Sequence, residues 1–379
     1  NLKFDTHKIN TNLIESFSCV EHNEEMTLPI LQSSRDLEED KKRNNLSPID
    51  TSLNYSYQRV QYISDLHLMH KLQNACCQSK EDILYVVKKI ANTIALESGN
   101  ILLINGDVSS DFTIYKLFVE ALSEVIDKNT TVVFTLGNHE LWNFPRIEID
   151  QIVTKYRNLL NEHSMYLLHN DLLYKEFNAP FSNPNTATHL IKYHDLCQMD
   201  KKQLSVLLRN ARYVILGGLG FSGYNTKFNA DNGIYRKTID RECEIKESKI
   251  FEDLYNHLHP ILSEKNTIIL THTPKIDWCQ KDNPEQNYIY VSGHTHRNFF
   301  HDDGEYRIYS DNQIGYYNNN PHLKSFLINT DYDYFSDYDD GIFEITKEQY
   351  NDFYCGKNIL MNFQREINIL YMLKKNGYY

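Results

Sequence analysis

Between residues 57 and 135 the sequence alternates strand-like and helix-like segments, and this alternation narrows the possible folds more than any other feature. The segments predicted as strands are Tyr57–Ser64, Ile101–Ile104 and Thr131–Thr135, and those predicted as helices are Glu81–Ser98 and Phe112–Asp127. The segment 101–104 is wholly apolar, as expected for a strand buried on both faces of a sheet. Apolar residues within 81–98 recur at helical spacing. This order of elements predicts an α/β fold with a mainly parallel sheet.

The rest of the chain predicts further elements and three regions. Later strands are predicted at Tyr213–Leu216, Thr267–Thr271 and Tyr288–Ser292, a long helix at Asp240–Lys265, short antiparallel strands within 299–328 with turns at Gly304 and Gly315, and helices at 346–355 and 358–375. The predicted regions are an N-terminal extension at 1–56, a central domain at 57–330 with an insert at about 145–211, and a C-terminal helical extension at 331–379.

Composition excludes several classes of protein. With 379 residues, 41% of them hydrophobic and 24% charged, the chain has ordinary globular composition and enough apolar residues for a large core. A formal net charge of −12 argues against a surface that binds long duplex nucleic acid, since such surfaces attract phosphates with Lys and Arg. We also expect no membrane association, because no apolar run is long enough to span a bilayer. Seven cysteines without a C-x-x-C pair indicate reduced thiols, so we expect a cytoplasmic location.

Residues with metal-binding side chains follow five of the predicted strands. They are Asp65 and His67 after the first strand, Asp107 after the second, Asn138 and His139 after the third, His272 after Thr267–Thr271, and His294 and His296 after Tyr288–Ser292. The carboxyl ends of parallel strands lie along one edge of a sheet, where α/β proteins place their sites. We therefore expect these side chains to gather at that edge.

The number and type of these side chains suit two divalent ions better than one. A single zinc ion takes four protein ligands in a structural site, and a set of seven mixed nitrogen and oxygen donors exceeds that. Two ions about 3.5–4 Å apart need a shared ligand, and a carboxylate such as that of Asp107 can bridge them. Imidazole, carboxylate and amide donors suit Mn, Fe, Co or Zn, and the sequence does not choose among these metals.

The motifs Asp65-x-His67, Gly106-Asp107, Gly137-Asn138-His139-Glu140, His272 and Gly293-His294-x-His296 occur in this order within residues 58–300. The set resembles that of the calcineurin-like metallophosphoesterase superfamily. The resemblance implies that the domain at 57–330 is a four-layer αββα sandwich, in which two mixed sheets pack face to face between helices.

The resemblance also implies roles for the individual residues. One ion would be held by Asp65, His67, Asp107 and His296, and the other by Asp107, Asn138, His272 and His294. His139 would bind no metal and would protonate the leaving group. The implied reaction is hydrolysis of a phosphate mono- or diester by a hydroxide that bridges the two ions.

The branch of the superfamily, and with it the substrate, stays open. Ser/Thr protein phosphatases have Arg before the Gly-Asn-His-Glu motif and carry Gly-Asp-x-x-Asp-Arg-Gly, whereas this chain has Leu136, Ser110 and Asp111 at the corresponding positions. The differences count against a phosphoprotein substrate. A nuclease or nucleotide phosphodiesterase, or a phosphatase for small molecules, is also compatible with the motifs.

Three basic residues are candidates for binding the substrate phosphate: Arg297, which follows the last motif, and Arg236 and Lys227, which follow a glycine-rich segment. Arg241 is a further candidate of the same kind. That segment, Gly218-x-Gly220-x-x-Gly223, matches the dinucleotide fingerprint but precedes turn-like residues where the fingerprint needs a helix. A non-catalytic binding module on the same fold is a remote alternative, since every ligand position is filled.

Overall fold

The computed structural model describes residues 57–176, 188–208, 211–262, 266–281, 288–297, 299–302, 306–310, 321 and 323–329. All of them belong to one compact unit, Tyr55–Tyr379. The extensions predicted at 1–56 and 331–379, including the helices at 346–355 and 358–375, lie outside the described residues, as do the turns at Gly304 and Gly315. The division of the chain into three regions therefore stays a prediction.

The first sheet has five strands in the order β12-β1-β2-β3-β4. Their bounds are β1 Tyr57–Ile63, β2 Ile101–Asn105, β3 Thr131–Thr135, β4 Tyr166–Leu167 and β12 Lys324–Asn329. β1, β2 and β3 are parallel neighbours, as the sequence predicts; β4, which was not predicted, is parallel to β3, and β12 is antiparallel to β1. Apolar side chains of four helices share a core with this sheet: α2 Leu68–Asn74, α3 Lys80–Glu97, α4 Phe112–Val125 and α6 Ile149–Glu162.

The second sheet has seven strands in the order β10-β11-β9-β8-β7-β5-β6. Their bounds are β5 Asp171–Glu176, β6 Thr188–Ile191, β7 Ala211–Gly218, β8 Thr267–Thr271, β9 Tyr288–Ser292, β10 Phe299–Asp302 and β11 Arg307–Ser310. Four helices pack their apolar residues against it: α7 Tyr193–Gln198, α8 Lys201–Leu207, α9 Arg241–Leu262 and α10 Lys275–Trp278. Between β7 and α9 lies a single turn of 3₁₀ helix, η3 Ala230–Asn232.

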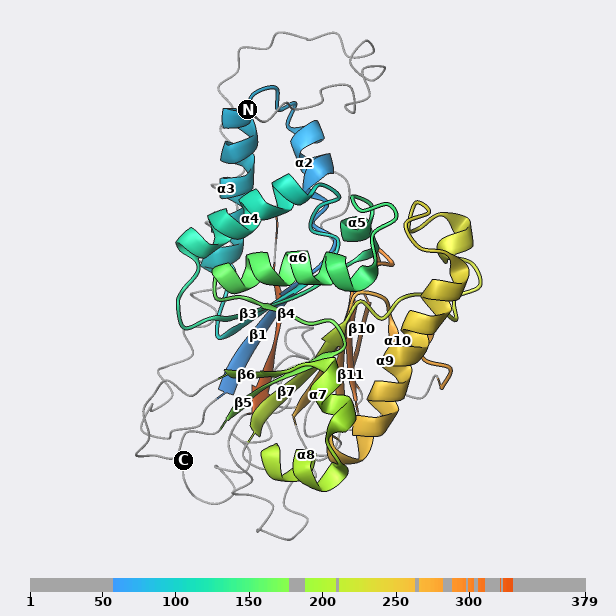
Figure 1. Cartoon of the computed structure of the whole chain (residues 1–379). Helices are drawn as coiled ribbons and strands as arrows, with labels where there is room; N and C mark the ends of the chain where they lie inside the picture. The colour runs from blue at the N-terminus through green and yellow to red at the C-terminus, as the bar shows by residue number, and fades with distance from the viewer. Residues whose placement is uncertain are drawn as a thin grey trace, which may run out of the picture. The chain divides into compact units, whose positions relative to one another are not determined.

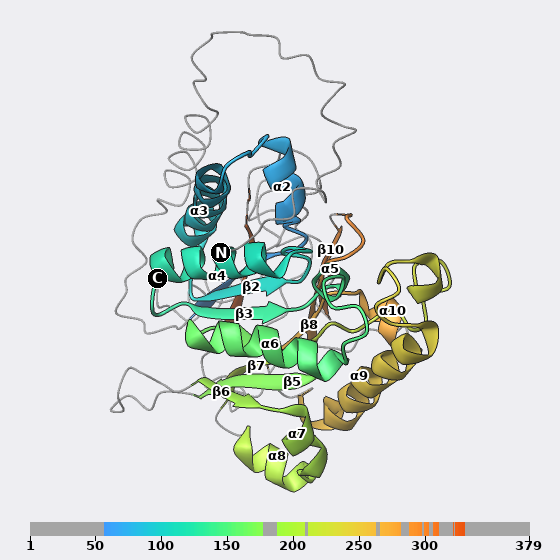
Figure 2. The ribbon, with the colours of Figure 1, turned by 45° about the horizontal axis from the view of Figure 1, so that its top comes forward.

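The inner faces of the two sheets form a core of their own. Val60, Leu103 and Val133 of the first sheet belong to the same buried cluster as Ile215 and Leu270 of the second. Figures 1 and 2 show α3 and α4 with the first sheet and α7, α8 and α9 with the second. The expected fold, two mixed sheets between helices, is confirmed.

Short polar side chains set the starts of two helices beside the first sheet. Before α3, the Ser79 hydroxyl accepts a hydrogen bond from the Asp82 N–H, and the Asp82 carboxylate accepts one from the Ser79 N–H, which completes a capping box. Before α4, the Asp111 carboxylate accepts hydrogen bonds from the N–H groups of Thr113 and Ile114. Asp111 is therefore a helix cap.

The strands after residue 299 differ in part from the prediction. β10 and β11 are antiparallel, but β11 is parallel to β9, and β12 joins the first sheet beside β1. Apolar patterning predicts which face of a strand is buried, whereas the choice of partner depends on the remainder of the sheet. The stretch 145–211, which we expected as an insert, supplies β4 to one sheet and β5 and β6 to the other.

Among the described helices, none combines the length and the apolar character that crossing a bilayer would require.

Candidate metal centre

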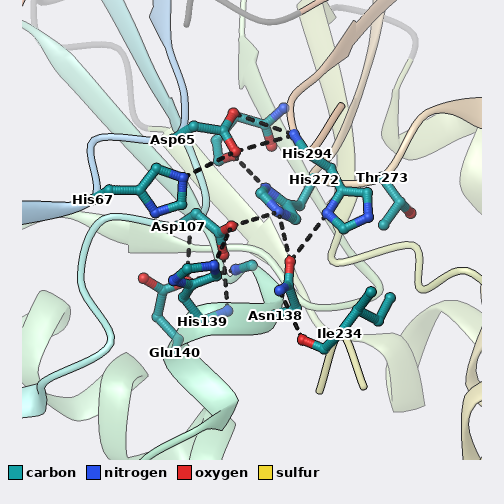
Figure 3. Close-up of polar contacts among 12 residues, drawn as sticks. Asp65, His67, Asp107, Asn138, His139, Glu140, Ile234, His272, Thr273 and His294 are labelled. Carbon is teal, nitrogen blue, oxygen red and sulfur yellow. Dashed lines mark hydrogen bonds and ion pairs between the residues drawn. The ribbon is translucent and has the colours of Figure 1, made fainter. Parts of the chain in front are cut away.

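The predicted metal ligands meet where strands of both sheets end. Their side chains leave the chain after β1, β2, β3, β8 and β9 and point toward a common centre, as Figure 3 shows for most of them. They form two groups of potential ligand atoms, each within 4.8 Å of one another: Asp65, His67, Asp107 and His296 in one, and Asp107, His272 and His294 in the other. The carboxylate of Asp107 belongs to both groups. Apart from Asn138, these two groups contain the residues that the resemblance implies for the two ions.

Asn138 completes the second group. Its Oδ1 lies 3.3 Å from Nε2 of His272 and 3.0 Å from Nδ1 of His294. Nε2 of His272 is also 3.4 Å from Oδ2 of Asp107. The structure therefore brings all seven predicted ligands together.

The donor atoms of the first group lie as close to one another as those of the second. Nε2 of His67 and Nε2 of His296 are 2.9 Å apart, and Nε2 of His296 lies 3.2 Å from Oδ1 of Asp65. Nitrogen and oxygen donors that converge on one small region are the arrangement that a divalent ion requires.

Burial and neighbouring charges set the protonation of these groups. Burial lowers the pKa of His67 and of His294 to about 4, so both imidazoles are neutral at pH 7, the form that binds metal. Burial also opposes charge on His272, but the carboxylate of Asp107 outweighs it and raises the pKa of His272 to about 10. For Asp107, the attraction of His139 and His272 overcomes burial and holds its pKa well below the usual range. A metal at the second group would therefore displace a proton from His272.

The backbone at most of the ligand positions is left-handed. Positive φ angles occur at five of the seven: Asp65 (56°), His67 (45°), Asp107 (54°), His294 (74°) and His296 (54°). This region is unfavourable for residues other than glycine, although Asp, Asn and His tolerate it better than most. Such strain persists where the surrounding structure enforces it, and it clusters at functional sites. The pattern is invisible in the sequence.

Behind the ligands, the buried carboxylate of Glu140 holds the turns that carry them. It accepts hydrogen bonds from the N–H groups of Asp107 (2.9 Å), Ser109 (3.0 Å) and Gly137 (2.7 Å). Burial and the nearby Asp107 raise the pKa of Glu140 to about 7. The sequence motif contains Glu140, but only the structure reveals this role.

Hydrogen bonds of the Asn105 side chain connect the two sheets next to the site. The side-chain NH₂ of Asn105, at the end of β2, donates to the carbonyl oxygens of Thr271 (2.9 Å) and Val291 (3.2 Å) in β8 and β9. Its Oδ1 accepts a 2.6 Å hydrogen bond from the hydroxyl of Thr135 in β3. Asn105 thus joins four of the strands that carry the ligands.

In the segment around η3, sequence reasoning singled out Lys227 and Arg236 but missed Ile234. The carbonyl oxygen of Ile234 accepts hydrogen bonds from Nδ2 of Asn138 (2.9 Å) and from Nε1 of Trp142 (2.8 Å). The first of these turns Oδ1 of Asn138 toward His272 and His294 (Figure 3). Because Ile234 acts through its main chain, no side-chain pattern could have identified it.

His139 follows Asn138 in the short helix α5 (Asn138–Leu141) and lies beside the ligands. Its N–H donates to Oδ1 of Asp107 at 2.8 Å, and its ring stacks on Trp142, with the ring centroids 3.5 Å apart. Burial lowers its pKa to about 3, although Asp107 opposes the shift. The guanidinium of Arg236 packs on the Trp142 ring, with its Cζ 3.7 Å from the ring centroid.

The other basic candidates differ in their surroundings. Arg297 is exposed and follows His296 directly. Lys227 lies in an exposed turn, where its N–H donates to Oδ1 of Asn225. Arg241 pairs with Glu244 and donates to the carbonyl oxygens of Ser222 and Gly223, so its guanidinium is engaged within the chain. Ring contacts link Arg236 through Trp142 to His139.

Solved structures from several organisms are similar to this chain. A phosphopantetheinyl hydrolase from Mycobacterium tuberculosis is 15% identical, covers 66% of this chain and 87% of its own, and has a TM-score of 0.39. A putative 5′-nucleotidase from Staphylococcus aureus is 12% identical, covers 78% of this chain and 57% of its own, and has a TM-score of 0.36. A dimetal phosphatase from Danio rerio has 11% identity, 67% and 86% coverage, and a TM-score of 0.34. No curated protein matches the chain.

The family model described as calcineurin-like phosphoesterase matches residues 59–298, which is more than half of the chain. The match spans the described strands from β1 to β9 and every residue of the two donor groups. The chain therefore belongs to the calcineurin-like phosphoesterase family.

Proposed function

We propose that this metallophosphoesterase hydrolyses phosphate mono- or diesters with two divalent ions. One ion would be held by Asp65, His67, Asp107 and His296, and the other by Asp107, Asn138, His272 and His294. The observation that carries the proposal is the position of Asp107, whose carboxylate belongs to both donor groups. A shared carboxylate is what two closely spaced ions need.

The donor set fits such ions chemically. Its imidazole, carboxylate and amide groups suit Mn, Fe, Co or Zn. His67 and His294 already have the neutral form that binds metal. When bound, the ions would polarise the phosphoryl oxygens and promote ionisation of water at neutral pH.

The chain's own residues prepare the site and handle the proton. The hydrogen bond from the His139 N–H fixes one oxygen of Asp107, and the Ile234 carbonyl fixes the amide of Asn138. His139 would then donate its proton to the departing oxygen of the ester. Its ring is neutral in the metal-free chain, and the negative charge of a bound phosphate favours the protonated form beside it.

The surroundings of the site favour a substrate other than a phosphoprotein. Ser110 stands where Ser/Thr protein phosphatases have a second Asp, and Asp111 caps α4 where they have Arg. Arg236 is the proposed phosphate contact because of its place on Trp142, and Arg297 and Lys227 are secondary candidates. A nucleotide phosphodiesterase or nuclease is an alternative within the proposal. Mn is one of the candidate native metals. The cytoplasmic location stays a prediction.

Metal content and turnover test the proposal together. Equilibrium dialysis followed by elemental analysis should find about two tightly held ions per chain. Activity on a panel of phosphomonoesters, linear diesters and cyclic diesters should disappear with a chelator and return with Mn²⁺ or a similar ion. Full turnover after exhaustive chelation would contradict the proposal, and fewer than about one ion per chain would favour a binding module.

A further inference from the structure

We infer that Trp142 is the positioning residue for His139, and that it orients the imidazole by stacking where related phosphatases use a carboxylate. The inference rests on the proposed role of His139 as the proton donor. It concerns a residue that the motif set does not include.

The first argument is the environment of the His139 ring. Its centroid lies 3.5 Å from that of Trp142, with the planes inclined by 29°, and the ring of His67 packs against it at 4.5 Å and 55°. Within the part of the chain that the structure describes, neither ring nitrogen of His139 makes a hydrogen bond, and the nearest carboxylate oxygen, Oδ2 of Asp107, is 3.6 Å from Nε2. Stacking therefore orients this ring.

The second argument is that this chain lacks the second Asp of the protein phosphatase motif, the residue that the resemblance implies for orienting the histidine. The notable position is Ser110, which replaces the second Asp of the phosphatase motif and whose carbonyl oxygen accepts a hydrogen bond from Nδ2 of Asn143. Asp107 cannot take over that role, because its carboxylate already faces both donor groups. A stacked indole fixes the plane of the imidazole without adding a negative charge and without engaging either ring nitrogen.

The third argument is that Trp142 is itself held on two sides. Its Nε1 donates to the carbonyl oxygen of Ile234, and the guanidinium of Arg236 lies 3.7 Å from the ring centroid. Since His139 occupies one face of the indole at 3.5 Å, Arg236 must occupy the opposite face. The indole is thus clamped between a cation and the imidazole.

The backbone of the clamp is strained in the way that functional segments often are. Arg236 and Lys237 have consecutive left-handed φ angles of 48° and 63°. Two such residues in a row persist only where the surrounding contacts enforce them. The hydrogen bond from Trp142 to Ile234 and the packing of Arg236 on the Trp142 ring are contacts that can hold this backbone in place.

The test compares two substitutions of Trp142 on two leaving groups. Ester pairs that differ only in an alkyl or a nitrophenyl leaving group separate proton donation from other steps. Trp142→Leu should lower kcat on the alkyl ester by about 10–100-fold, part of the roughly 10²–10⁴-fold of general acid catalysis, and affect the nitrophenyl ester much less. Trp142→Phe, which keeps an aromatic face, should retain most of the activity. Both variants should keep the metal content of the parent protein.

Tyr85→Leu provides a matched control, because it removes an aromatic ring that is 64% exposed on α3. It should change neither substrate. An equal loss on both leaving groups for Trp142→Leu would overturn the inference and indicate general damage to the site.

A double-mutant cycle asks whether Trp142 acts through His139. In a His139→Ala background, Trp142→Leu should cause no further loss on the alkyl ester, whereas an additive loss would overturn the inference. If His139→Ala itself affects both leaving groups equally, the proton-donor role in the proposed function fails first, and the positioning role fails with it.

Fluorescence measures the stack without metal or substrate. The chain has two tryptophans, and Trp278 is fully buried in the core beside α9. The emission that Trp142→Phe abolishes should change in His139→Ala, because the imidazole covers one face of that indole. Unchanged emission would mean that the two rings do not stack in solution and would overturn the inference.

Discussion

The N–H of His139 donates a hydrogen bond of 2.8 Å to Oδ1 of Asp107, and Oδ2 of the same carboxylate lies 3.6 Å from Nε2 of the His139 ring. One carboxylate thus links the proposed bridging ligand to the proposed proton donor. Although the two residues touch, their substitutions should have different consequences, because only one of them is expected to hold metal.

Asp107→Asn should be the most damaging single ligand change. The amide oxygen can still accept the hydrogen bond from His139, so the fold should survive, but a neutral amide bridges two cations poorly. We expect the metal content to fall from about two ions per chain to one or fewer, with turnover lost in parallel. Elemental analysis and kcat on the same preparation measure both, and Asp231→Asn, at an exposed position, is the control. Two retained ions and a near-normal rate would show that Asp107 does not bridge.

His139→Ala should retain both ions and lose activity selectively. An alkoxide departs poorly without a proton, so turnover of alkyl phosphates should fall by about 10²–10⁴-fold. A nitrophenolate is stable as an anion, so turnover of nitrophenyl phosphates should fall much less. Metal stoichiometry and the two rates provide the comparison. Loss of metal together with an equal loss on both substrates would assign His139 to maintaining the cluster.

Gly137→Ala should displace Asp107. An added Cβ would lie 2.6 Å from the Asp107 nitrogen and 2.8 Å from its Cγ, closer than real contacts allow. The φ of Gly137 is an ordinary −107°, so the penalty is steric. We expect weaker binding of both ions, measured by titration with Mn²⁺ or Zn²⁺.

Gly99→Ala is the control for that substitution. Its Cβ would also make a close contact, 2.8 Å, but with Oε1 of Gln61, which is not one of the proposed metal ligands. Metal affinity should therefore be unchanged in Gly99→Ala. Undiminished affinity in Gly137→Ala would mean that the turn can yield without moving the carboxylate.

Asp277→Asn should change how stability depends on pH. Burial raises the pKa of Asp277 to about 6, although hydrogen bonds from Asn225 and Ser222 oppose the shift, and Glu244 raises it further. Because the folded pKa exceeds the unfolded value of 3.8, the native state binds more protons between these values. The wild-type chain should therefore lose about 3 kcal/mol of unfolding free energy as the pH rises from about 4 through 6.

The Asn variant lacks this titration, and its amide can keep the contacts with Asn225 and Ser222. Its unfolding free energy relative to wild type should therefore increase between pH 4 and 7 in denaturant titrations. A difference that does not vary with pH would place the folded pKa of Asp277 near its ordinary value.

The sequence alone predicted the three central strands of the first sheet and the donor residues because both have local signals. β2 and β3 are short, mostly apolar runs and β1 mixes apolar with polar residues, and each of the three is followed within three residues by Asp or Asn. The motif order then indicated the second sheet, which the strand patterns by themselves did not. The parallel pairing of β11 with β9 was missed, since alternation encodes the buried face of a strand and not its neighbour.

The polar and aromatic residues that support the site could not be predicted from the sequence, because their contacts join distant parts of the chain or use the main chain. The contact from Ile234 to Asn138 uses a main-chain carbonyl, which any residue provides. Trp142 reads in the sequence as one aromatic residue among many, and the hydrogen bond that holds its indole comes from Ile234, almost a hundred positions later. Long-range packing of this kind leaves no periodic trace along the chain.

The left-handed backbone at five ligand positions also limits how the family site can decay over evolutionary time. Branched residues such as Val or Ile are strongly disfavoured at the φ angles of Asp65, His67, Asp107, His294 and His296, whereas glycine relaxes there and asparagine is tolerated. A lineage that no longer needed the metals would still inherit these turns. We therefore expect inactive descendants of this enzyme to carry Gly or Asn at the five positions. Such proteins would keep the left-handed turns after the metal ligands themselves have been lost.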